Sequence, residues 1–141
     1  MDNEIITKRL EYIKEKLNDL KYDLDKYEKV EDERDKKTIQ GAIERWSEEI
    51  VESAVMINNE ILSLKNKVPD SYYNSFIELK NFGIFDKEFV YRIASTAGYR
   101  NRLAHDYMNV DTEISITSAK NILDLYKIYI KKVYDFIEGK K

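Results

Sequence analysis

The chain has 141 residues, a length that suits a single domain spanning residues 1–141. It contains no cysteine, which excludes a disulfide framework and a thiolate metal site. Charged residues make up 36% of the chain and the formal net charge is −3, so any nucleic-acid contact must come from a local patch. No apolar run approaches the roughly 18 residues of a membrane span, and the charged N-terminal stretch lacks a signal-peptide core. We therefore expect a cytoplasmic protein without membrane contact.

The first predicted element is a long amphipathic helix near the N-terminus. Its apolar residues alternate spacings of four and three, the heptad pattern of a helix packed lengthwise on others: Ile6, Leu10, Ile13, Leu17, Leu20, Leu24 and Tyr27. Residues 28–37 are almost all charged, and we interpret them as a solvated connection or a frayed helix end.

A second long helix is predicted from the same period in Ile39, Ile43, Trp46, Ile50, Ala54, Ile57, Ile61 and Leu64. Pro69 is expected to end it, because proline cannot continue the hydrogen-bond ladder. A short third helix is predicted over residues 72–82, with Asp70 or Ser71 as its N-cap and Gly83 as its stop.

The fourth helix is predicted to begin after Asp86, because aspartate is a favoured N-cap. Residues 108–112 are predicted to form a loop, and Asp111 or Thr112 is expected to cap the last helix. One face of that helix is apolar: Ala119, Ile122, Leu123, Tyr126, Ile130, Val133 and Ile137. Because no strand pattern occurs, the sequence predicts an all-α, up-and-down bundle of about five helices.

The only histidine of the chain lies in the stretch GYRNRLAHDYMNV. Between residues 89 and 105 there is no acidic residue, although four basic or titratable side chains lie there: Arg92, Arg100, Arg102 and His105. The planar arginine fork donates two parallel hydrogen bonds to a phosphate. Histidine exchanges protons near neutral pH. Together they provide what cleavage of a phosphodiester requires when a ribose 2′-OH is the nucleophile, without a metal.

The spacing of these residues places a condition on that chemistry. On one continuous helix, positions five apart differ by about 140°, so Arg100 and His105 would point away from each other. Asn101 and Arg102 would share the face of His105. Either the helix ends near Ala104 and His105 turns back, or Arg100 acts across a subunit boundary. Cleavage also needs both a base and an acid, so we expect a homodimer, which would bring two histidines together.

Residues 100–107, RNRLAHDY, resemble the signature of the HEPN-domain ribonuclease toxins of the HepT family. That signature is arginine, four residues, histidine, one residue and tyrosine, with a polar residue commonly beside the arginine. Its places are filled by Arg100, Asn101, His105 and Tyr107. The chain length, the helical order and the segment AIERWSEEIVESAVMINNEIL also resemble the family, so the resemblance spans nearly the whole chain.

The resemblance implies a homodimer that cleaves RNA in a cleft at the dimer interface, without a metal or other cofactor, and leaves a cyclic phosphate end. It implies an endoribonuclease toxin of a type VII toxin–antitoxin pair (HepT/MntA-like). The partner would be a minimal nucleotidyltransferase antitoxin of the MNT type, which silences the toxin by attaching AMP to Tyr107. Arg100 would stabilise the scissile phosphate, and His105 would act as general acid or base. Asn101 would orient one of them, and Arg102 would contact the RNA backbone or the antitoxin.

Two other functions stay open on the sequence. One is a non-catalytic HEPN module that binds nucleotides and pairs with a nucleotidyltransferase. The other is a purely structural helical dimer, in which Arg100, Arg102 and His105 are helix-end charges stabilised by the helix dipole, worth about 0.3–1 kcal/mol each. Asp106 is either a loop carboxylate or the partner of an arginine, and Arg92 is a further candidate for RNA contact.

Overall fold

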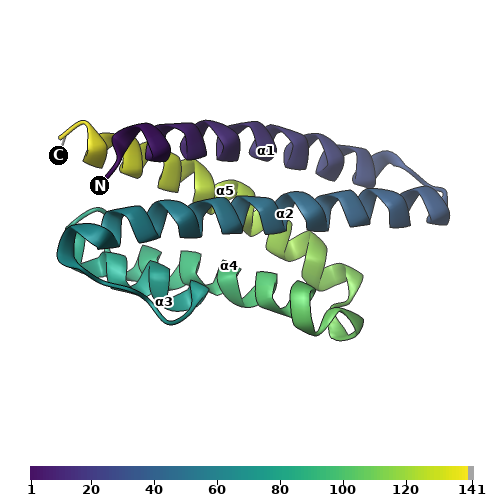
Figure 1. The fold of residues 1–141 in the computed structure, drawn as a ribbon. Coiled ribbons are helices and arrows are strands. Elements are labelled where there is room, and N and C mark those ends of the chain that lie inside the picture. Colours follow the sequence, from purple (N-terminus) through teal and green to yellow (C-terminus); the bar gives the residue numbers. More distant parts are fainter. Residues whose placement is uncertain (140–141) are drawn as a thin grey trace.

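The computed structural model describes residues 1–139 and is built from helices (Figure 1). Within those residues there are five α-helices and no strand: α1 (Asn3–Lys29), α2 (Glu33–Leu62), α3 (Tyr72–Ile77), α4 (Lys87–His105) and α5 (Thr112–Ile137). Three short 3₁₀ turns join them: η1 (Ser63–Lys65), η2 (Glu78–Phe82) and η3 (Tyr107–Asn109). The predicted all-α class with about five helices is therefore confirmed.

The four longer helices alternate in direction, as expected for an up-and-down bundle. In Figure 1, α1 and α2 lie antiparallel along the length of the molecule, and α4 runs on the other side of α2. Helix α5 crosses back obliquely behind α2, and its end lies near the start of α1. The short α3 packs on α4 and α2. This arrangement lays the end of α4 along the first half of α2, which positions the site.

The core is formed by the heptad stripes that the sequence predicted. In α1, Ile6, Leu10, Ile13, Leu17, Leu20 and Leu24 are buried, and Tyr27 packs partly buried against them. Helix α2 contributes Ile39, Ile43, Ile50, Ala54, Ile57 and Ile61 to the same core, and α5 contributes Ala119, Ile122, Tyr126 and Val133. No helix among residues 1–139 is long and apolar enough to cross a membrane.

Both ends of α2 differ from the prediction. The helix begins at Glu33, so much of the charged run of residues 28–37 is helical rather than a connection. The Asp32 side chain caps it by accepting the backbone N–H groups of Arg34 and Asp35, and the acidic first turn suits the helix dipole.

The α-helix ends at Leu62, well before Pro69, so the predicted stop is wrong. The chain tightens into η1, and Asn66 then adopts the left-handed conformation (φ 54°) that reverses its direction. Leu64 lies in this turn and is 50% exposed, so its assignment to the buried stripe is also wrong.

The predicted caps of the later helices are largely confirmed. Ser71 caps α3, Asp86 caps α4 and Asp111 caps α5, each through its side-chain oxygen and a backbone N–H three residues on. Gly83 ends η2 with a φ of 70°, which glycine adopts without strain. The third helix differs in one respect, because residues 72–82 divide into α3 and η2.

Candidate active site

His105 is the last residue of α4. The backbone N–H of Asp106 donates to the carbonyl of Arg102 at 2.8 Å, so the helical ladder continues past His105. The alternative in which the helix ends near Ala104 and His105 turns back is therefore wrong. On this continuous helix Arg100 and His105 point to sides about 140° apart.

Arg100 is fixed against α2 and α3. Its Nη2 and Nε both donate to Oε1 of Glu52, at 2.8 and 3.2 Å. Its guanidinium lies over the ring of Tyr72, 4.9 Å from the ring centroid. Nη1 makes only a long contact, 3.5 Å, with Oδ1 of Asn101. The side chain is only 18% exposed. Of the guanidinium nitrogens, Nη1 makes the longest hydrogen bond.

His105, by contrast, is exposed. Within residues 1–139 the structure gives it neither a hydrogen bond nor an ion pair, and nothing joins it to Arg100. A single protomer thus contains both predicted catalytic side chains but does not bring them into contact.

Arg102 and Asp106 brace the turn that follows the histidine. Nη2 of Arg102 donates to the carbonyl of Asn109 at 3.0 Å. The Asp106 carboxylate accepts the Asn109 side-chain amide at 2.7 Å, so its partner is an amide within the turn and not an arginine. These two contacts close η3 and place Tyr107 within it.

Tyr107 is tied to α2 by its hydroxyl. The hydroxyl donates to Oε1 of Glu44 at 2.8 Å, while the ring remains 54% exposed. This hydrogen bond to a carboxylate is the main cause that raises the pKa of Tyr107, with burial and the charges of Glu44 and Glu48 adding to it. The phenol is therefore held in its protonated form.

The acidic residues of α2 are the part of the site that the sequence analysis missed. Glu44, Glu48 and Glu52 recur every four residues and lie on one face of the helix, where they line a hollow beside Tyr107. Burial raises the pKa of Glu48, and Glu52 and Glu44 raise it further, against the lowering effect of Arg100. The spacing was visible in the sequence, but only packing shows that this face meets α4.

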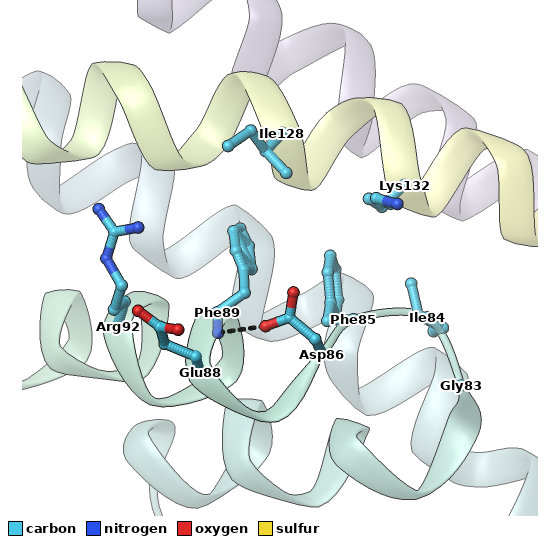
Figure 2. A pocket seen from close by; sticks show the side chains of 9 residues that line it. All are labelled: Gly83, Ile84, Phe85, Asp86, Glu88, Phe89, Arg92, Ile128 and Lys132. Atoms are coloured by element: carbon cyan, nitrogen blue, oxygen red, sulfur yellow. Dashed lines mark hydrogen bonds between the residues drawn. The ribbon is translucent and has the colours of Figure 1, made fainter.

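Arg92 lies away from these residues. It lines a separate pocket between the start of α4 and α5, with Phe89, Ile128 and Lys132 among its neighbours (Figure 2). The N-cap hydrogen bond from the backbone N–H of Phe89 to Asp86 joins two residues that line that pocket (Figure 2). Arg92 is thus not part of the cluster around Arg100.

The outer side of α4 carries a second feature, which we call the exposed stripe. Its members are spaced four, three, four and three apart, and all are exposed: Tyr91, Ser95, Gly98, Arg102 and His105. This spacing places the five residues on one face of the helix. Nothing lies within 4 Å of a Cβ built on Gly98, so the face is open there. Among residues 1–139 no group of three or more His, Asp or Glu residues is placed to hold a metal ion.

Known proteins resemble this chain in sequence and in fold. Residues 6–133 match the family described as "Ribonuclease HepT-like". The chain is 34% identical over 137 residues to the tRNA nuclease HepT of Aphanizomenon flos-aquae, covering 94% of this chain and 90% of that protein.

Two solved structures share the fold. The tri-AMPylated HEPN toxin of Shewanella oneidensis, in complex with an MNT antitoxin, superposes with a TM-score of 0.81 at 19% identity, over 95% of this chain and 98% of that one. The cytosolic protein YutE of Bacillus subtilis superposes with a TM-score of 0.70 at 15% identity, over 92% and 90% of the two chains. With the family match spanning most of its length and a relative of high coverage, the chain belongs to the HepT-like ribonuclease family.

Proposed function

We propose that this protein is a toxin that cleaves RNA in the cytoplasm without a metal, with Arg100 and His105 as its catalytic residues. The observation that carries the proposal is the anchored guanidinium of Arg100, which Glu52 and Tyr72 hold ready beside the exposed end of α4. A preorganised donor of this kind stabilises charge that develops on a phosphate in the transition state. Because the Aphanizomenon relative is a tRNA nuclease, tRNA is the first substrate to test.

The reaction is an internal transesterification. The ribose 2′-oxygen loses its proton to a base and bonds to phosphorus, and the bond from phosphorus to the 5′-oxygen breaks. The leaving 5′-oxygen takes a proton from an acid, and a 2′,3′-cyclic phosphate remains. His105 exchanges these protons, and Arg100 neutralises the non-bridging oxygens. Asn101 orients the Arg100 guanidinium, which it already contacts.

The active unit in this proposal is a homodimer. Arg100 and His105 diverge on one helix, so a phosphate is reached by both only when the second side chain comes from another protomer. The exposed stripe of α4 leaves room for such an assembly, because it faces solvent in the protomer and has small residues, Ser95 and Gly98, at its middle.

The toxin is silenced by a nucleotidyltransferase antitoxin of the MNT type, which attaches AMP to Tyr107. The fold neighbour from Shewanella is an AMPylated toxin bound to such an antitoxin. Tyr107 lies two residues from His105 and is half exposed, so its ring is accessible to a partner. Bulky negative charge at this position repels the RNA backbone from the catalytic residues.

Cleavage of tRNA in EDTA tests the nuclease. We expect the wild type to cut and both His105→Ala and Arg100→Ala to be inactive, provided that mass measurement shows no AMP adduct on Tyr107. Binding of RNA without cleavage by unmodified wild type would instead indicate a non-catalytic module. Absence of any interaction would indicate a structural dimer.

Mixing the two inactive variants tests the shared site. A heterodimer of Arg100→Ala with His105→Ala has one intact pair, made of one residue from each protomer. Random reassociation of the subunits of a symmetric dimer should then restore about a quarter of wild-type cleavage. If mixing restores nothing while the wild type is active and dimeric, either the two residues do not act across the interface or one site needs the histidines of both protomers.

A further inference from the structure

The carboxylate of Glu44 is an unusual group to find in the interior of this bundle. Glu44 is 4% exposed, and all the partners that the structure of residues 1–139 gives it are neutral. Oε2 accepts from Ser115 at 2.6 Å and from Gln40 at 3.3 Å. Oε1 accepts from Tyr107 at 2.8 Å. Burial of a carboxylate is costly unless it is both hydrogen-bonded and paired with a cation, and among the described residues Glu44 has hydrogen bonds but no ion pair, so this arrangement calls for an explanation beyond packing.

The surrounding side chains fix the direction of that carboxylate. Ser115 is fully buried and also accepts the hydroxyl of Tyr99 at 3.1 Å. The amide of Gln40 is oriented in turn by Thr112, whose hydroxyl donates to its Oε1 at 2.9 Å. These contacts come from α2, α4 and α5, so Oε2 is held from the core side. Oε1 accepts from the Tyr107 hydroxyl, its only donor among the described residues, and both Glu44 and Tyr107 line the hollow.

From this geometry we infer that Glu44 is a catalytic residue that the toxin contributes to its own modification, by accepting the proton of the Tyr107 hydroxyl during nucleotidyl transfer. The inference rests on the proposed AMPylation of Tyr107. In the step, the phenol oxygen bonds to the α-phosphorus of ATP as its proton passes to Oε1 of Glu44. The bond from that phosphorus to the bridging oxygen breaks, and pyrophosphate leaves. Tyr107 needs such an acceptor, because its raised pKa keeps the phenol protonated at neutral pH.

The product of this step cannot keep the hydrogen bond. The tyrosyl oxygen of the adduct has no proton to donate, and the new phosphodiester carries a negative charge. Once Oε1 of Glu44 has released the transferred proton to water, Glu44 and the neighbouring Glu48 repel the adduct. Modification therefore releases the Tyr107 side chain from α2, in the turn directly after His105, while Arg102 and Asp106 still brace that turn. This gives the antitoxin a physical means to disturb the site besides blocking it with bulk.

The rate of AMP transfer to Tyr107 tests the inference. All variants are made in the His105→Ala background, so that toxin can be purified unmodified, and each is incubated with the cognate nucleotidyltransferase and ATP. We expect Glu44→Gln to slow AMP incorporation by about a hundredfold, the lower end of the range for general base catalysis. Glu113→Gln is the matched control, because this acid is exposed on α5 and does not line the hollow, and we expect the rate to change by less than about threefold.

The outcomes distinguish a failure of the role inferred for Glu44 from a failure of the proposed AMPylation of Tyr107. If the His105→Ala parent takes up no AMP at Tyr107, the proposed modification fails. If the parent and Glu44→Gln are modified equally fast, the modification stands and the role of Glu44 is refuted. Should Glu44→Gln fail to fold, Glu44→Asp keeps the carboxylate but withdraws it by one methylene. A folded Glu44→Asp variant that reacts at the parent rate would refute the role equally.

Discussion

The two sides of α4 are built differently, although they carry the two halves of one proposed reaction. The side that bears Arg100 is anchored, with the guanidinium bound to Glu52 and stacked on Tyr72. The side that bears His105 is open, and its whole stripe from Tyr91 onward faces solvent. Under the proposed roles, one protomer holds its phosphate-binding group, Arg100, in place by itself but leaves its proton-transfer group, His105, exposed.

This difference is consistent with the chemistry that each group performs. A guanidinium loses much conformational freedom when it binds a phosphate, so anchoring it in advance lowers the cost of binding. A histidine held on a second protomer contributes only when the dimer forms, which makes cleavage depend on assembly. The following predictions test the contrast, beginning with the largest expected effect.

Loss of His105 should have the largest effect on cleavage while leaving the stability of the protomer unchanged. We expect His105→Ala to lower the cleavage rate of tRNA at least about a hundredfold, because general acid–base catalysis supplies about 10²–10⁴-fold. Because the His105 side chain is exposed and has no hydrogen bond or ion pair in the described protomer, the melting temperature of dilute protein should not change. Lys127→Ala, an exposed change on α5, is the control for both measurements. A large fall in melting temperature would mean that His105 is a structural residue.

Loss of the ion pair between Glu52 and Arg100 should lower cleavage less than loss of His105 does. We expect Glu52→Gln to lower kcat for tRNA cleavage by about tenfold, because Arg100 loses a charge-assisted pair that fixes its geometry. Its effect on the free energy of unfolding should stay below about 1 kcal/mol, since the pair is partly exposed. Faster cleavage with a lower KM would contradict the prediction and show that Glu52 competes with phosphate for Arg100.

Most of the fold was predictable because it depends on local patterns. The heptad stripes gave the buried faces of α1, α2 and α5, and short polar side chains marked caps such as Asp86 and Asp111. The start of α2 was missed because the charged run of residues 28–37 was interpreted as a connection or a frayed helix end. Glutamate, lysine and arginine are good helix formers, and Asp32 supplies a cap that the pattern alone does not favour over its neighbours.

Only part of the membership of the site was predictable, because the motif marked the residues of α4 and η3 but not Glu44, Glu48 and Glu52 of α2. The motif gave the family and the enzyme class, a HepT-like ribonuclease, and the family match confirms both. The catalytic roles of Arg100 and His105 and the homodimer stay predictions. The contacts of Arg100 with Glu52 and of Tyr107 with Glu44 join positions 48 and 63 residues apart. Such pairs follow from how α4 lies on α2, which no local pattern in one sequence contains.

The aromatic support of Arg100 should matter less than its ion pair. We expect Tyr72→Leu to lower cleavage by about two- to fivefold, because a cation–π contact at a partly exposed site is worth about 0.5–1 kcal/mol. Tyr72→Phe keeps the ring, and within residues 1–139 the Tyr72 hydroxyl has no hydrogen bond, so this variant should behave as wild type. Equal losses in both variants would indicate a role for the hydroxyl with RNA and not for the stacked ring.

The smallest effect is expected at Arg102, which belongs to the exposed stripe but also braces η3 through the Asn109 carbonyl. If it contacts the RNA backbone, Arg102→Ala should lower the slope of log K against log salt concentration by about 0.7, with little change in maximal cleavage rate. Arg102→Lys keeps the charge but not the planar fork, so it should restore the slope. An unchanged slope in Arg102→Ala, together with a lower melting temperature, would mean that Arg102 stabilises η3 and does not contact RNA. The exposed stripe would then offer only His105 for contact with RNA phosphates.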